Sequence, residues 1–214
     1  MVVSQRFPEQ FDGVLACAPG LNLHKAALYG HSWDVQSFAE VSAATGIYGR
    51  DGQPLLNKTF TDEDLDLVAQ AILGACDGLD NLEDGIIDSF PACTNAVVAP
   101  KLAAVQCMGA KRVTCLSAAQ VKAIQNVYAG PRDAQGQMLW SDWAYDRGIG
   151  GKVGNNYNQG WRSWKIGAYD APQNGAIIAT LGSGSVSALF TTPPTVMPAQ
   201  GPEPLAFLRS INVQ

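Results

Sequence analysis

Five acidic side chains lie between two cysteines in one short stretch of this 214-residue sequence. Cys76 and Cys93 bracket the stretch, and its acidic residues are Asp77, Asp80, Glu83, Asp84 and Asp88. Carboxylates this close together repel one another unless a cation or water screens them. Gly78 and Gly85 allow tight turns that aim several carboxylates at one point. Calcium takes about six to eight oxygen ligands, and a single bent loop can supply most of them.

These residue types predict a calcium loop over residues 76–93. The predicted ligands are the carboxylates of Asp77, Asp80 and Asp84 and the carbonyls of Leu82 and Ile86. The side chains of Leu82 and Ile86 are expected to face a core. The EF-hand pattern fails here, because counting from Asp80 puts Leu82 at the third position and Pro91 at the twelfth. The alternative is a helix end followed by an acidic turn that only faces water.

The cysteine spacing predicts two local disulfides. Cys76 and Cys93 bracket the acidic stretch, and Cys107 and Cys115 bracket a second short segment. Neither pair has Cys-x-x-Cys spacing and the sequence holds only two histidines, which argues against a zinc site. Disulfides of this kind imply an oxidising compartment. The fifth cysteine, Cys17, is expected to be a buried, unpaired thiol, since a free cysteine behaves as a small hydrophobe.

Composition excludes several classes of partner. The net charge is −5 and no run of lysine or arginine occurs, which argues against nucleic acid or an anionic membrane as partner. No apolar stretch approaches the roughly eighteen residues of a spanning helix, and no charged-plus-apolar leader opens the sequence. Charged residues make up 15%, a low share for a globular chain, and the length fits one domain or slightly more.

The elements that must position these residues are mostly helical. Apolar spacing and capping residues predict helices over 21–45, from 61 to the acidic stretch, and over 100–105, 118–129, 183–190 and 202–211, with Gly30 interrupting the first. Residues 131–138 are typical of a turn, and residues 148–159 of a mobile loop. The apolar run 14–18 is typical of a buried parallel strand, which normally needs neighbours in a covered sheet.

Several segments resemble the tannase and feruloyl esterase family. They are Ser4–Pro19, the acidic stretch, Cys107–Val121, Val127–Arg132 and Gly160–Trp164, so that the resemblance extends from about residue 4 to 194. The family's members are α/β-hydrolases with a large inserted lid that carries a disulfide-bracketed calcium loop. The resemblance implies an α+β chain: residues 1–20 as a fragment of an α/β-hydrolase core, and residues 21–214 as a mostly helical, loop-rich lid domain.

The resemblance also implies roles for particular residues. It places the calcium ligands at the same five positions of the acidic stretch. It makes Trp161, Trp164 and Phe190 candidates for contact with the aromatic part of an ester, although each can equally be a core aromatic.

The family's catalytic residues are expected outside this chain. Its nucleophile sits on a Gly-x-Ser-x-Gly elbow shortly before the segment that resembles residues 4–19, and its acid and histidine follow the lid. Residues 182–186, Gly-Ser-Gly-Ser-Val, do not form such an elbow. No catalytic residue is therefore predicted within residues 1–214.

The sequence predicts the lid portion of a secreted or periplasmic carboxylic ester hydrolase that acts on aromatic esters such as hydroxycinnamates or gallates. Expected partners are calcium, an aromatic ester, and a missing hydrolase core or a second copy of the chain. Two alternatives remain open: a stand-alone calcium-stabilised module that binds aromatic ligands, and an esterase with an unconventional serine.

Overall fold

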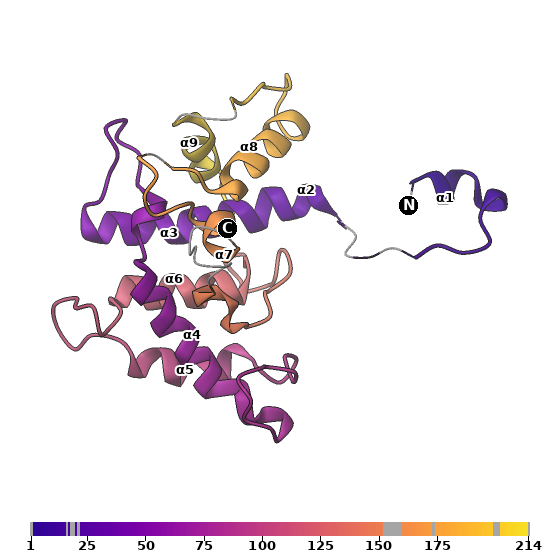
Figure 1. The fold of residues 1–214 in the computed structure, drawn as a ribbon. Helices are drawn as coiled ribbons and strands as arrows, with labels where there is room; N and C mark the ends of the chain where they lie inside the picture. The colour runs from indigo at the N-terminus through magenta and orange to yellow at the C-terminus, as the bar shows by residue number, and fades with distance from the viewer. Residues whose placement is uncertain are drawn as a thin grey trace.

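A computed structural model describes residues 2–15, 17, 20, 22–151, 160–172, 174–198 and 202–213, which form a helical protein (Figure 1). The α-helices are α1 Val2–Arg6, α2 Leu23–Lys25, α3 Ser32–Thr45, α4 Asp62–Cys76, α5 Asn95–Ala104, α6 Ala118–Ala129, α7 Trp161–Lys165, α8 Ile177–Leu189 and α9 Glu203–Ser210. The shorter turns are η1 Pro8–Gln10, the π-helical η2 Ala26–His31, η3 Leu56–Lys58, η4 Asp77–Asp80 and η5 Arg147–Gly150. Extended pairing among the described residues consists of isolated bridges, such as Arg132 with Met138. The predicted mostly helical chain is confirmed.

The helix predicted over residues 21–45 forms as three consecutive pieces, α2, η2 and α3. The predicted interruption at Gly30 takes the form of a π-helical turn, in which Gly30 is buried. An added Cβ at Gly30 would lie 3.2 Å from the ring of Trp140. The wider turn and the missing side chain therefore let Trp140 approach η2 closely.

Two reciprocal caps start the helices on either side of the disulfide loops. At α4 the Thr61 side chain accepts from the Asp64 backbone N–H while the Asp64 carboxylate accepts from the Thr61 N–H. Ser117 and Gln120 do the same at α6. These starts confirm the predicted helices, because each cap satisfies backbone donors that the first turn leaves unpaired.

Helix α3 crosses the middle of the body, with α4, α5 and α6 on one side and α8 and α9 on the other (Figure 1). Its buried face contributes Val35, Phe38 and Val41 to the core. Phe38 meets the ring of Phe60 edge to face at 6.1 Å and that of Trp161 at 5.8 Å. Trp161 of α7 is thus fixed by packing on α3.

The N-terminal residues correct one prediction. Residues 2–15 lie apart from the helical body (Figure 1), and at positions 14 and 15 no strand forms. Leu15 is 91% exposed and Cys17 is an exposed, unpaired cysteine, so the predicted buried strand and buried thiol are wrong for these residues. A parallel strand needs neighbouring strands, and none of the isolated bridges among the described residues involves this segment.

The predicted loop 148–159 begins as η5, and its residues 152–159 lie outside the described part of the chain. Within the described residues, no helix is both long and apolar enough to cross a membrane.

Candidate functional site

A cavity of about 430 Å³ opens where η2, α6, η5, α7 and α8 meet. Its lining is mostly apolar and aromatic: His31, Val127, Tyr128, Trp143, Ala144, Asp146, Gly148, Ile149, Trp161, Trp164, Lys165 and Ile178. A small-molecule site has this character, with aromatic walls and a few polar groups that orient the ligand.

Three tryptophans line the cavity, and they differ in how firmly they are held. Trp161 packs on Phe38 of α3 and is half-buried. Trp164, one helical turn later, is 49% exposed. The ring of Trp143 lies under the Lys165 ammonium, with Nζ 3.8 Å from the ring centroid. The cavity therefore combines a fixed aromatic wall with an open aromatic edge.

A buried ion pair adjoins the tryptophans. Lys165 donates to the Asp34 carboxylate of α3, and both side chains are almost fully buried. Burial raises the pKa of the Asp34 carboxyl, while the nearby ammonium opposes part of that shift. The pair ties α7 to α3, and its cation–π contact with Trp143 orients one cavity wall.

His31 contributes an uncharged imidazole. Burial, with the Lys165 charge as a second cause, lowers the pKa of His31 to about 4. Its Nδ1 is buried without a hydrogen-bond partner. An added Cβ at Gly182 of α8 would lie 2.9 Å from that nitrogen, so α8 packs directly on the ring. At neutral pH the site thus offers a neutral ring nitrogen and one paired cation.

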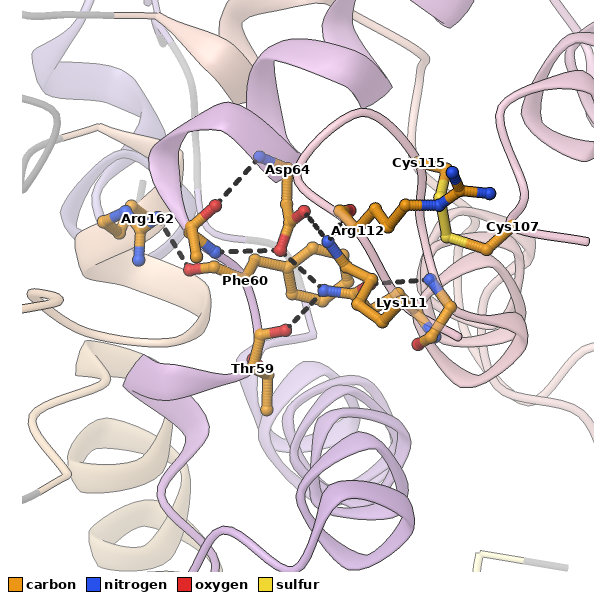
Figure 2. Close-up of polar contacts among 11 residues, drawn as sticks. Thr59, Phe60, Asp64, Cys107, Lys111, Arg112, Cys115 and Arg162 are labelled. Carbon is orange, nitrogen blue, oxygen red and sulfur yellow. Dashed lines mark hydrogen bonds and ion pairs between the residues drawn. A yellow bond between two sulfur atoms is a disulfide. The ribbon is translucent and has the colours of Figure 1, made fainter. Parts of the chain in front are cut away.

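Arg162 anchors α7 from its other face. Its guanidinium is buried, and Nη2 donates to the Phe60 carbonyl at 2.9 Å (Figure 2). The same nitrogen lies 2.9 Å from the Asp62 carboxylate. Burial lowers the pKa of Arg162, and Asp62 partly offsets that effect. Because Arg162 lies between Trp161 and Trp164 in a five-residue helix, this anchor fixes the helix that carries both rings.

A buried network holds the second disulfide loop against α4. Lys111 reaches from the loop closed by Cys107 and Cys115 to the buried Asp64, at 2.7 Å. Gln120 Nε2 donates to the same carboxylate at 2.8 Å, so α4, α6 and the loop meet at one side chain (Figure 2). The network positions the helix that leads into the acidic stretch.

The acidic stretch forms a surface loop closed by the predicted disulfide between Cys76 and Cys93. Each predicted aspartate ligand accepts a backbone N–H of the loop: Asp77 from Gly85 at 2.9 Å, Asp80 from Leu82 at 2.8 Å and Asp84 from Ile86 at 3.0 Å. Gly85 has φ of 83°, which favours glycine. The loop is therefore shaped by its own carboxylates.

The side chains of Leu82 and Ile86 correct another prediction. They are 58% and 56% exposed, whereas the neighbouring Ile87 packs against the core. The turns of the loop direct Ile87, and not Ile86, toward the core. The spacing of apolar residues in the sequence does not indicate this shift by one residue.

In kind, the loop's carboxylates and carbonyls fit a hard cation such as calcium. Among the described residues no three carboxylate, imidazole or thiol side chains gather closely enough to enclose a metal. The carboxylates of the loop would have to converge to hold one.

Of the three predicted aromatic contacts, Trp161 and Trp164 line the cavity together. Phe190, at the end of α8, does not line it and instead lies with its ring 6.2 Å from that of His24. Sequence reasoning missed Trp143, His31 and the pair of Lys165 with Asp34. The available signal was a charged residue inside an apolar helical face on each of α3 and α7.

Residues 1–192 match the sequence profile of the family described as tannase and feruloyl esterase, so this chain belongs to that family. Mono(2-hydroxyethyl) terephthalate hydrolase of Piscinibacter sakaiensis is 46% identical over 206 residues, covering 92% of this chain and 33% of that protein. A probable feruloyl esterase B of Emericella nidulans is 34% identical over 129 residues, 59% of this chain and 21% of that protein.

The fold is also found in a solved structure. The crystal structure of feruloyl esterase B from Aspergillus oryzae superposes with a TM-score of 0.54 at 21% identity, covering 97% of this chain and 34% of that one. This chain therefore spans about a third of the length of the Piscinibacter sakaiensis hydrolase and of the Aspergillus oryzae esterase.

Proposed function

We propose that this chain is the aromatic-binding lid portion of a carboxylic ester hydrolase, with residues 1–20 belonging to the hydrolase core and residues 21–214 to the lid. The observation that carries the proposal is the cavity of about 430 Å³ with Trp143, Trp161 and Trp164 in its lining. A single substituted benzene ring fits a cavity of this size. Membership of the tannase and feruloyl esterase family supports an aromatic ester as ligand.

The cavity's own residues bind and orient. The tryptophans offer ring faces for stacking, and the apolar lining excludes water from the bound ring. Lys165 holds Trp143 in place while its charge is matched by Asp34. Trp161 and Trp164 are the proposed aromatic contacts, and any contact made by Phe190 would lie outside this cavity.

We assign the nucleophile, acid and histidine of the hydrolytic reaction to residues outside this chain. The hydroxyls of Ser183, Ser187 and Ser210 donate to backbone carbonyls and not to a histidine. His31 has its Nδ1 packed on α8 and no carboxylate bonded to that nitrogen, whereas a catalytic histidine is oriented by such a partner.

We further propose that the loop 76–93 binds calcium and that the protein works in an oxidising compartment, secreted or periplasmic. Asp77, Asp80 and Asp84 would hold the ion together with the carbonyls of Leu82 and Ile86. The ion would supply charge neutralisation and loop rigidity. Two closed disulfides support the compartment. Adding calcium should raise the melting temperature, and chelation should reverse the rise, because an ion bound by the folded state stabilises it by mass action.

The purified chain, assayed on p-nitrophenyl, gallate and ferulate esters, tests the proposal. We expect an aromatic ester to bind without turnover, as a lid without its nucleophile should do. Turnover abolished by substituting one serine would contradict it and favour an esterase with an unconventional serine. Failure to bind any aromatic ester would contradict the assignment of the cavity.

A further inference from the structure

A second cleft, of about 720 Å³, separates the acidic loop from residues 144–147. Asp84, Gly85, Ile86, Ile87 and Phe90 line one side, and Ala144, Tyr145, Asp146 and Arg147 line the other. Arg147 Nη1 donates to the Gly85 carbonyl across this cleft at 3.2 Å. An exposed guanidinium thus bridges the acidic loop to the segment that faces it.

The same segment also forms a wall of the aromatic cavity. Ala144 and Asp146 line both spaces, and Gly148 and Ile149 continue the wall of the aromatic cavity. Asp146 Oδ1 accepts from the Gly148 N–H at 2.7 Å, and Ile149 is buried, so η5 is held as a short rigid turn. Arg147 therefore belongs to a turn whose neighbouring residues line the aromatic cavity.

Gly85 connects the acidic loop to the 144–147 segment through two hydrogen bonds. Its N–H donates to Asp77 at 2.9 Å, and its carbonyl accepts from Arg147. Asp77 is one of the proposed calcium ligands, so a bound ion would act on its contact with Gly85. Arg147 is the side chain on the opposite wall that is bonded to that residue.

We propose that Arg147 is a positioning residue that couples ion binding in the acidic loop to the shape of the aromatic cavity. The coupling rests on the proposed calcium site but makes a separate claim about how its occupancy is transmitted. Calcium binding should tighten binding of an aromatic ester by about fivefold, the lower end of ordinary coupling between two sites. By reciprocity, the ester should tighten calcium binding by the same factor.

The chain contains a matched control for the Arg147 contact. Arg132 Nη1 donates to the Gly136 carbonyl at 2.9 Å, and Gly136 also has a positive φ, of 80°. That contact lies within the 132–138 turn and borders neither the acidic loop nor the aromatic cavity. Arg132→Met also removes a hydrogen bond from an arginine to a glycine carbonyl, but this bond lies outside the proposed coupling between the loop and the cavity.

Calorimetric titrations of the whole chain test the coupling, with calcium chloride and methyl ferulate as probes and tryptophan emission as a second readout. In wild type and in Arg132→Met, calcium should change the emission and tighten ester binding about fivefold. In Arg147→Met, calcium should still bind, yet both responses should be lost. Arg147→Lys should restore part of them, because an ammonium can also donate to the Gly85 carbonyl.

Each outcome assigns a failure to one claim. If calcium does not bind to wild type, the proposed calcium site falls and the coupling falls with it. If calcium binds but ester affinity and emission do not change, the coupling alone is overturned. A response in Arg147→Met equal to that of wild type also overturns it.

Discussion

The aromatic cavity and the acidic loop place charge in opposite environments. At the cavity, whose lining includes Lys165, the side chains of Lys165 and Asp34 are buried and paired with each other. In the loop, Asp80 and Asp84 lie near the surface, where water and backbone N–H groups share their charge. The buried pair depends on both partners, since either one alone would be an uncompensated charge in a poorly solvated site. The loop carboxylates remain solvated and free to take further ligands.

The comparison shows which region tolerates change. A surface carboxylate can be moved or neutralised at small cost, so the acidic loop can rearrange around an ion. The cavity is assembled by helices that are fixed to one another through Asp34, Lys165 and Arg162. We therefore expect the helices that assemble the cavity to stay fixed, and the acidic loop and the 144–147 wall bonded to it through Arg147 to adjust.

The largest expected effect is the loss of the buried pair. Lys165→Met leaves Asp34 buried and unpaired, and should lower the free energy of unfolding by about 3–5 kcal/mol in urea denaturation. Lys122 offers a matched control, because its ion pair with Glu40 at 2.8 Å is exposed on both sides. Lys122→Met should cost less than about 1 kcal/mol. Equal losses in the two variants would remove the contrast between buried and exposed charge.

The next effect is that of opening the loop. Replacing both Cys76 and Cys93 by serine should lower the free energy of unfolding by about 3 kcal/mol, because the unfolded chain regains the entropy of a loop whose ends are 17 residues apart. Cys17→Ser, at an exposed unpaired cysteine, should leave the stability unchanged. A double variant as stable as wild type would show that the loop is held by its other contacts alone.

A third effect is a pH dependence of the free energy of unfolding that comes from His31 in the cavity lining. Folding lowers the pKa of His31 from 6.5 to about 4, so between these values the unfolded state binds a proton that the folded state does not. Stability should therefore fall as pH falls, by about 2–3 kcal/mol near pH 4.5 relative to pH 7. His31→Gln should remove that part of the pH dependence, whereas His24→Gln at an exposed ring should keep it. Urea denaturation of the three proteins at both pH values measures the difference.

Local chemistry in the sequence predicted much of the fold. The caps at Thr61 and Ser117 identified helix starts that the structure confirms, because capping involves neighbours three residues apart. Both disulfides were likewise predicted from spacing. The strand predicted at residues 14–15 was wrong. An apolar run favours burial, but it does not supply the neighbouring strands that a parallel strand requires.

The cavity was only partly predictable, for a related reason. Trp161 and Trp164 are one helical turn apart, so sequence places them together, whereas Trp143 and His31 arrive from other segments. The pair of Lys165 with Asp34 joins positions 131 residues apart. No local sequence pattern indicates such a contact. The packing that holds the aromatic cavity together is therefore the part of the molecule that the sequence predicts least.

Ester binding to the cavity is the most direct test of the central claim, that the three tryptophans form an aromatic site. Calorimetric titration with methyl ferulate should show binding to wild type, weakened about tenfold, or about 1.4 kcal/mol, by Trp164→Ala. Phe190→Ala should bind like wild type, since Phe190 is similarly exposed, at 47% against 49%, but lies outside the cavity. Absence of binding to wild type, or unchanged affinity in Trp164→Ala, would contradict the account.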